Sequence, residues 1–196
     1  MTSRWREIAV AGHTGDTVAA RAALSDPDPV ARELALGATS RLGVLTDDDL
    51  RSAMFDGVPS VRRRAAMLAG QRPSVSLREL LDDPDVTVVE AAAWACGEQE
   101  IVGDDVLATL VDLGVASSDA LVREACTAAL GAIRDPRGLP TILHGCNDKP
   151  AVRRRAVLAL APFDGEAVDA ALHAALEDRD WQVRQAAEDV LRAANG

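Results

Sequence analysis

A short phrase recurs along this chain of 196 residues: an apolar residue, an Arg and, three positions later, an Ala. It reads VRRRAAMLA from Val61 and VRRRAVLAL from Val152. The six copies, two of them degenerate, are centred on these anchor positions: Arg32, Arg62, Val89, Arg123, Arg153 and Arg184. The anchors lie 30, 27, 34, 30 and 31 residues apart. Such a period indicates small repeated units that stack and share a core, because one unit cannot bury its own apolar face.

Each repeat has the same internal order, which predicts two helices joined by a turn. A short amphipathic run comes first, followed by a breaker rich in Asp with Pro or Gly, such as SDPDP, FDGVP or NDKP. Asp accepts hydrogen bonds from free N–H groups at a helix N-terminus, and Pro is tolerated in the first helical turn. An Ala-rich run with helical spacing follows the breaker. After the fifth breaker, Val152, Ala156, Ala159, Leu160 and Phe163 share one helix face.

We therefore expect a single all-α domain over residues 1–196, a right-handed α-solenoid of six stacked helix hairpins. Apolar residues make up 48% of the sequence but aromatic residues only 3%, so the core must be largely Ala, Leu and Val, which suits closely packed helices. Residues 1–15 are expected to form a capping helix, because a terminal repeat needs a polar outer face. The predicted repeats are 16–43, 44–72, 73–100, 101–134, 135–163 and 164–196.

The fifth repeat carries a family resemblance. The segment GAIRDPRGLPTILHGCNDKPAVRRRAVLALAPF contains a G-x-x-x-D-P-R linker, an L-P-x-L first helix and a V-R-R-x-A second helix. It resembles the short HEAT-type repeat of the phycobilisome-lyase-like class, and LEDRDWQVRQAAEDVL resembles the second half of that repeat. The resemblance covers residues 16–194 and is strongest in the second, fifth and sixth repeats. It implies an ARM-type fold.

The resemblance also implies a structural ladder. In such repeats, the Asp before the second helix bonds the Arg of its own or a neighbouring repeat. The residues assigned to this ladder are Asp56, Arg62, Asp119, Arg123, Asp148, Arg153, Asp180 and Arg184. The first Arg of each triplet therefore has a structural interpretation.

The sequence offers no constellation that would support catalysis. Its three His residues form no His-Glu motif, so the di-iron hydroxylases built from similar repeats are not matched, and no Gly-rich phosphate loop is present. We therefore predict a protein without enzymatic activity, cofactor or metal. His13 is expected in a loop, and His144 and His173 are expected on first helices in ordinary packing roles.

The cysteines and one acidic cluster also have structural interpretations. Cys96 and Cys126 occupy small-residue positions on second helices and are expected to be buried, whereas Cys146 lies next to a turn and is expected to be accessible. An odd number of cysteines without CxxC spacing favours reduced thiols. The TDDDL segment at residues 46–50 is expected to cap a helix rather than to bind a metal.

The charge balance bears on the partner and the compartment. The formal net charge is −10, and an acidic surface repels the phosphate backbone of nucleic acids. Glu90 and Glu124 further interrupt a basic track between the two Arg triplets, so nucleic-acid binding is disfavoured. The N-terminus has charges where a signal peptide needs an apolar run, and no segment holds eighteen uninterrupted apolar residues. We expect a cytoplasmic protein without membrane association.

Second helices of stacked hairpins line the concave side, so equivalent positions form rows along it. The position five residues after the anchor holds Met67, Trp94 and Leu158 in three of the repeats, and charged residues flank this row. Trp and Arg supply anchoring area in a binding site, and charges set orientation. The predicted partner-binding residues are Arg63, Arg64, Met67, Glu90, Trp94, Glu124, Arg154 and Leu158. In the alternative interpretation, Trp94 turns into the core between repeats.

The sequence favours a non-catalytic binding or scaffold protein that recognises a protein or peptide segment on the concave face. The second and third Arg of each triplet would then bind acidic or carboxylate-bearing partners. The alternative is a nucleic-acid-binding protein or an enzyme of the DNA-glycosylase-like HEAT-repeat class. The partner's identity and the oligomeric state stay open.

Overall fold

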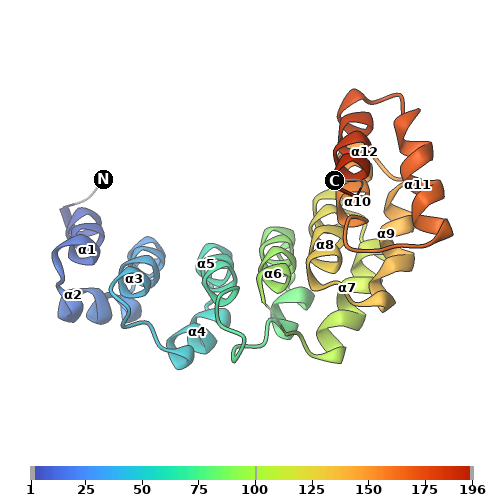
Figure 1. Cartoon of the computed structure of the whole chain (residues 1–196). Coiled ribbons are helices and arrows are strands. Elements are labelled where there is room, and N and C mark those ends of the chain that lie inside the picture. The colour runs from blue at the N-terminus through green and yellow to red at the C-terminus, as the bar shows by residue number, and fades with distance from the viewer. Residues whose placement is uncertain (1–2, 100, 195–196) are drawn as a thin grey trace. The chain divides into compact units, whose positions relative to one another are not determined.

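The computed structural model describes residues 3–99 and 101–194, which form α-helices and short 3-10 turns without any strand. The arrangement in hairpins confirms the predicted all-α solenoid (Figure 1). No helix among the described residues combines the length and the apolar character needed to cross a membrane.

Each hairpin consists of a first helix or turn and a second helix. The first helices are α2 (Thr17–Ala22), α4 (Asp47–Met54), α7 (Asp104–Ala116), α9 (Leu139–Gly145) and α11 (Glu166–Leu176). The second helices are α3 (Pro29–Arg41), α5 (Pro59–Ala69), α6 (Val86–Glu98), α8 (Ala120–Ile133), α10 (Pro150–Ala159) and α12 (Trp181–Ala194). They follow an N-terminal helix, α1 (Ser3–Thr14). The 3-10 turns are Ala23–Ser25, Arg78–Asp82 and Pro136–Gly138.

The chain divides into two compact units, residues 1–92 and residues 93–196. We call them the N-terminal unit and the C-terminal unit. The division falls within α6, so its first seven residues belong to the N-terminal unit and the rest to the C-terminal unit.

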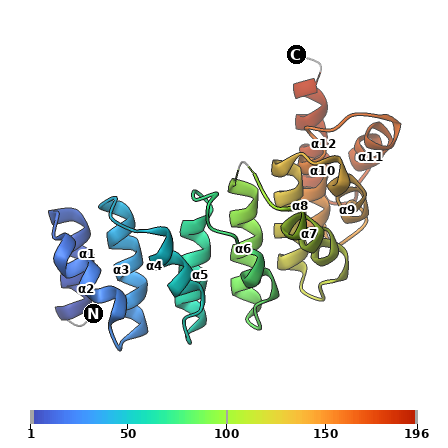
Figure 2. The same ribbon diagram turned by 90° about the horizontal axis from the view of Figure 1, so that it is seen from below.

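In the N-terminal unit, helices α1, α3 and α5 lie side by side in one layer, and α2 and α4 lie in a second layer (Figures 1 and 2). The apolar face of α1 packs on α3, where Ile8 is buried with Ala31 and Ala35. The N-terminal helix therefore covers the first hairpin from the position of a second helix. This agrees with the capping role expected for residues 1–15.

The third repeat departs from the helix-turn-helix pattern. Its first amphipathic run forms only the 3-10 turn Arg78–Asp82. A 3-10 turn has three residues per turn, so Leu77 and Leu80 fall on the same side, and both are fully buried together with Val75 and Leu81. The short turn thus buries the apolar side chains that a full first helix would bury.

In the C-terminal unit, α8, α10 and α12 lie side by side in one layer, and α7, α9 and α11 lie in a second layer (Figures 1 and 2). The Ala-rich composition allows these second helices to approach closely. At Gly131 of α8, an added Cβ would lie 2.6 Å from the Cβ of Ala159 on α10, so a side chain here would push the two helices apart. This close packing fixes the spacing of the side chains that α8 and α10 expose.

Candidate functional site

Four of the five anchor arginines form a regular ladder, in which each guanidinium binds a carboxylate of the following repeat. Arg62 donates from Nε and Nη2 to the two carboxylate oxygens of Asp83 at 2.6 and 2.8 Å. The same two-bond geometry, at 2.6–2.8 Å, joins the other pairs: Arg32 with Asp56, Arg123 with Asp148, and Arg153 with Asp178. All four pairs are largely buried, so each rung ties consecutive repeats together.

The third guanidinium nitrogen of each anchor holds the turn of its own repeat. Nη1 of Arg62 donates to the main-chain oxygen of Asp56 at 2.8 Å, and Nη1 of Arg153 donates to that of Asp148 at 2.8 Å. The hydrogen bond from Arg153 also lowers the pKa of Asp178 below its ordinary value, because it stabilises the charged carboxylate. The first Arg of each triplet is therefore a structural residue, committed to its own turn and the next.

Three members of the predicted ladder are wrong. Arg184 donates to the main-chain oxygen of Asp178 at 2.7 Å, but it pairs with no carboxylate of the described residues. Asp119 and Asp180 bind no anchor Arg; each caps its own second helix, accepting from the main-chain N–H of Leu121 at 2.8 Å and Gln182 at 2.9 Å. The carboxylate of the rung comes instead from a residue two positions earlier, as in Asp178. The sequence could have identified the rung Asp by its spacing, since it lies five or six residues before the anchor of its own repeat.

The sequence reading also missed three ladder residues, which are Arg32, Asp83 and Asp178. For one further rung, the sequence has neither the Arg nor the Asp. Val89 occupies the third anchor, and Ser117 occupies the place of the rung Asp in the fourth turn. Because both charged residues are replaced together, neither leaves an isolated buried charge.

The second and third arginines of the triplets take other roles. Arg63 and Arg154 are exposed on α5 and α10. Arg64 lies over Gly37 of α3, where an added Cβ would be 2.8 Å from its Nη2 atom. The three arginines of one triplet thus bind the next repeat, face solvent and cover the preceding helix, respectively.

In the C-terminal unit, the third arginine of the triplet stacks on a tryptophan. The Cζ atom of Arg155 lies 4.8 Å from the ring centroid of Trp94, and its Nη2 lies 3.5 Å from Oε1 of Glu124. Trp94 keeps 37% of its surface exposed, so it does not turn into the core as the alternative interpretation required. The ring, the guanidinium and the carboxylate form one cluster across α6, α8 and α10.

A cavity of about 230 Å³ lies between α10 and α12 of the same unit. It is lined by Arg154, Leu158, Trp181, Gln182, Gln185, Ala186 and Asp189. Trp181, which is 65% exposed, was not singled out from the sequence, although it is the first residue of α12. We call Trp94, Glu124, Arg154, Arg155, Leu158 and Trp181 the second-helix face of the C-terminal unit.

The remaining predicted partner-binding residues belong to the N-terminal unit. Met67 is 48% exposed on α5, one turn beyond Arg63 and Arg64. Glu90 is half-buried on α6. The predicted residues thus divide between two units, four in each.

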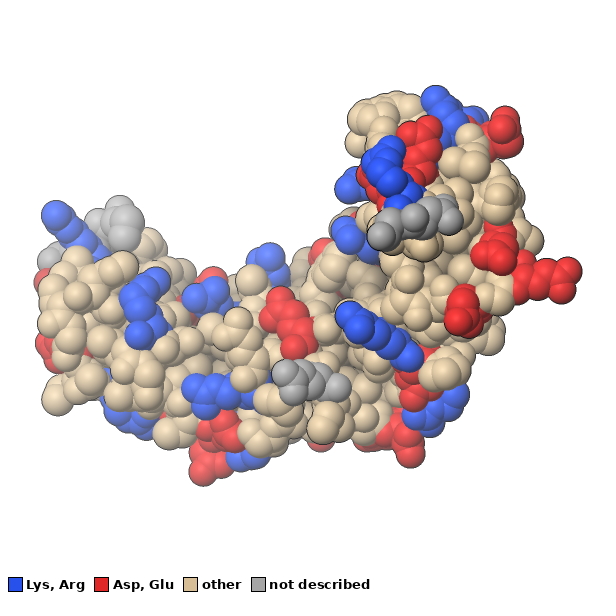
Figure 3. Space-filling model, in the orientation of Figure 1, with Lys and Arg blue, Asp and Glu red and all other residues tan. Residues whose placement is uncertain are grey.

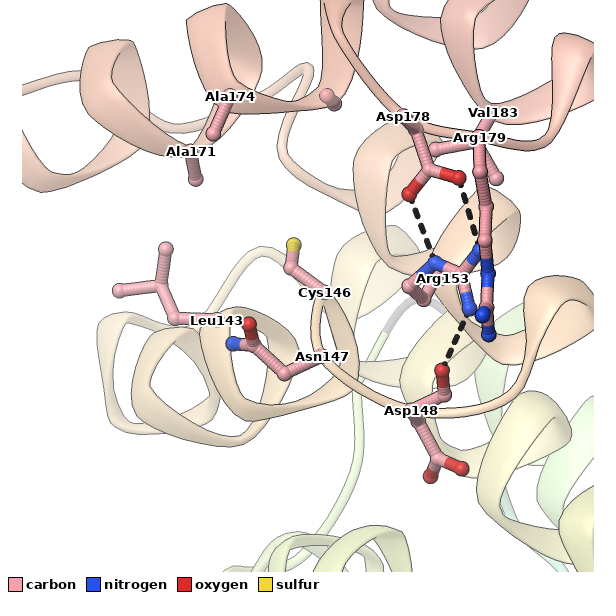
Figure 4. A pocket seen from close by; sticks show the side chains of 11 residues that line it. Leu143, Cys146, Asn147, Asp148, Arg153, Ala171, Ala174, Asp178, Arg179 and Val183 are labelled. Carbon is pink, nitrogen blue, oxygen red and sulfur yellow. Dashed lines mark hydrogen bonds and ion pairs between the residues drawn. The ribbon is translucent and has the colours of Figure 1, made fainter.

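A cavity of about 660 Å³ lies between α9 and α11 of the C-terminal unit (Figure 4). The sulfur of Cys146 points into it, and the Arg153–Asp178 rung lies along one wall.

Burial raises the pKa of the Cys146 thiol to about 11, and raises those of Cys96 and Cys126 to about 12. Both Cys96 and Cys126 are buried as predicted, whereas Cys146 is partly exposed. A thiol of high pKa is protonated at neutral pH and a poor nucleophile.

Other potential chemical groups have structural roles. Within residues 3–99 and 101–194, no group of three or more His, Cys, Asp or Glu side chains could hold a metal ion. The TDDDL segment caps α4 as predicted: Thr46 Oγ1 accepts from the Asp49 N–H, and the Asp49 carboxylate accepts from the Thr46 N–H. His13 lies in the last turn of α1 rather than in a loop.

Basic and acidic side chains alternate over the visible face of each unit (Figure 3). Arg–Asp pairs such as Arg21 with Asp49 and Arg72 with Asp47 bring opposite charges together. The visible face therefore carries no broad surface of a single sign.

Comparison with protein-family models matches HEAT repeats at residues 48–131 and 107–192. No curated protein matches the chain. Among solved structures, it is similar to YibA of E. coli, with 20% identity and a TM-score of 0.69 over 93% of this chain and 70% of that one. It is also similar to a designed armadillo repeat protein in complex with the peptide (KR)4, with 16% identity and a TM-score of 0.59 over 95% and 98%. Human deoxyhypusine hydroxylase in complex with glycerol is 20% identical, with a TM-score of 0.50 over 98% and 79%.

At these identities the solved structures establish the fold, since the same solenoid carries designed and enzymatic proteins alike. The family matches identify HEAT repeats in general and do not single out the phycobilisome-lyase subclass. Together they span residues 48–192, well over half of the sequence. The chain therefore belongs to the HEAT-repeat family.

Proposed function

We propose that this protein is a non-catalytic binding module that recognises a segment of another protein on its second helices. The observation that carries the proposal is the pair of exposed tryptophans, Trp94 and Trp181, on the second-helix face of the C-terminal unit. Large exposed aromatic side chains supply the area that anchors a bound chain, and Trp181 also lines the cavity between α10 and α12. Among the described residues, Phe55 is the third exposed Trp or Phe side chain.

The charges on this face favour an acidic segment. Arg154 lines the cavity and forms no ion pair with any described residue, whereas Arg155 is already engaged by Glu124 and Trp94. An Asp or Glu of the bound segment would therefore meet Arg154, and an apolar side chain beside it would pack on Leu158 and Trp181. Arg suits this role because its planar guanidinium binds a carboxylate through two hydrogen bonds.

The N-terminal unit offers a smaller surface of the same type. Arg63 is exposed and unpaired within the described chain, and Met67 lies one turn further along α5. A flexible Met beside an Arg suits a contact that adapts to its partner. We propose that Arg63, Arg64, Met67 and Glu90 contribute contacts in that unit.

The solved structures support this type of binding without defining its chemistry. The designed armadillo repeat protein binds a peptide of alternating Lys and Arg. Here the available side chains are arginines and tryptophans, so the preferred peptide should have the opposite charge. Electrostatic complementarity of this type sets the orientation and the association rate of a charged segment.

A peptide-display selection tests the proposal. The wild-type protein should enrich sequences in which Asp or Glu lies close to an aromatic or aliphatic residue. Trp94→Ala and Arg154→Glu should each reduce binding of the selected peptides by about tenfold or more, because each removes an anchor. Phe55→Ala is the matched control, since Phe55 is an aromatic residue with 74% exposure at the end of α4, a first helix.

Two results would contradict the proposal. The first is selection of peptides that bind Trp94→Ala and Arg154→Glu as tightly as wild type while circular dichroism shows unchanged helicity. The second is a retarded complex with duplex DNA at low salt that Arg154→Glu abolishes, because that result would favour the nucleic-acid interpretation.

A further inference from the structure

A cluster of cationic side chains surrounds one cavity of the N-terminal unit. The cavity has a volume of about 190 Å³ and lies among α1, α3 and α5. His13 comes from the last turn of α1, Arg41 from the last turn of α3, and Arg64 from α5. Glu33 is the single carboxylate that lines it. This site takes no part in the peptide-binding proposal for the C-terminal unit.

The two guanidinium groups differ from most others in this unit because they have no acidic partner. Seven arginines of the unit form ion pairs with aspartates, and these are Arg4, Arg21, Arg32, Arg51, Arg62, Arg72 and Arg78. Arg41 and Arg64 form no ion pair with any described residue, including the Glu33 that lines the same cavity. Two unpaired guanidinium groups at one cavity form a local positive site on a chain whose net charge is −10.

Glycines on the neighbouring helices place these arginines. An added Cβ at Gly12 would lie 2.9 Å from Nη1 of Arg41 and 2.9 Å from the Cα of Ala38. An added Cβ at Gly37, the residue before Ala38, would lie 2.8 Å from Nη2 of Arg64. Both guanidinium groups thus reach the same turn of α3, and the absence of side chains at Gly12 and Gly37 leaves the space that they occupy.

We propose that this cavity binds one oxyanion group, either a phosphate or a carboxylate, between Arg41 and Arg64. Each guanidinium presents a planar fork of N–H donors that matches two oxygens of such a group, and His13 provides a further donor at the rim. A volume of this size corresponds to about six water molecules of the bulk liquid, enough for one anionic group with residual waters. Glu33 opposes the anion and limits its affinity.

The test is a titration of the full-length protein with sodium phosphate, sodium sulfate and sodium acetate in buffer of low chloride concentration. The sequence contains three histidines, so the imidazole NMR signals are readily separated. The His13 signals should shift with saturation, whereas those of His144 and His173 should not. Arg64→Gln and Arg41→Gln should each weaken the binding of the best anion by about tenfold.

Matched variants separate a site from general electrostatics. Arg6→Gln makes the same charge change in the same unit, but the exposed Arg6 of α1 does not line the cavity, so the anion affinity of this variant should stay within about twofold of wild type. Gly37→Ala should lose binding without unfolding, because its methyl group displaces only the flexible end of Arg64. Glu33→Gln should tighten binding, since it removes the opposing carboxylate.

The three salts also distinguish the source of the group. Tighter binding of phosphate and sulfate than of acetate assigns a phosphate ester, and the reverse order assigns a carboxylate. The proposal is overturned if none of the three anions shifts the His13 signals saturably. It is equally overturned if Arg6→Gln weakens binding as much as Arg64→Gln.

Discussion

Arg153 and Asp178 lie twenty-five residues apart in the sequence, yet two hydrogen bonds of 2.8 Å join the guanidinium of one to the carboxylate of the other. Arg153 simultaneously holds the main-chain oxygen of Asp148 in its own turn. One side chain therefore fixes the turn of the fifth repeat and its spacing from the sixth. The next residue, Arg154, is exposed and forms no ion pair with any described residue.

This contrast predicts very different effects for two adjacent substitutions. Arg153→Ala should lower the free energy of unfolding by about 3 kcal/mol, because it leaves the largely buried carboxylate of Asp178 without its cation. Arg154→Ala should change it by less than about 0.5 kcal/mol. Urea unfolding followed by circular dichroism measures both values. Equal effects of the two substitutions would show that the rung contributes nothing specific.

Acid should weaken the ladder within a defined pH range. Hydrogen bonds from Arg32, Arg123 and Arg153 lower the pKa values of their carboxylate partners below those of the unfolded chain. These carboxylates therefore stabilise the folded state fully above about pH 5, and that stabilisation is lost as the pH falls through about 4 and then through the lower folded pKa values.

The urea midpoint measures this dependence. It should change little between pH 7 and pH 5.5 on account of these groups and should fall steeply below about pH 4. Asp178→Asn provides the control, since its side chain does not titrate, and it should show a shallower acid dependence together with a lower midpoint at pH 7. An equally steep decline in this variant would assign the acid sensitivity to other groups.

The three cysteines should react with thiol reagents in two classes. Cys146 is partly exposed at the mouth of a cavity, whereas Cys96 and Cys126 are buried. In the native protein, a disulfide reagent should modify one thiol, and in denaturant it should modify three. The thiolate is the reactive form and the pKa of Cys146 is raised to about 11, so the rate should increase about tenfold for each pH unit between 7 and 9. Cys146→Ser should abolish the native reaction; modification of Cys96 or Cys126 at a similar rate would contradict their burial.

The helices were predictable because their signals are local. An Asp that caps a helix, a Pro in the first turn and an Ala-rich run with helical spacing all act within a few residues, as at Asp28 and Pro29 before α3. The 3-10 turn Arg78–Asp82 escaped the pattern, because a short run with Leu77 and Leu80 suits either type of helix.

The partners of the arginines were less predictable, since they depend on contacts over more than twenty residues. Asp119 and Asp180 lie closer in sequence to the anchors of their own repeats than the rung positions do. Each of them caps its own second helix instead. The stacking of Arg155 on Trp94 could not be predicted either. It joins α6 to α10 and depends on how closely the second helices pack.

Every rung of the ladder points the same way along the chain, from an Arg to the Asp of the turn that follows. A copied segment that runs from one turn to the next carries one acceptor at its start and one donor after it. Duplication or removal of such a segment therefore leaves every charge matched, and an array of this kind can lengthen or shorten by whole modules without any compensating substitution.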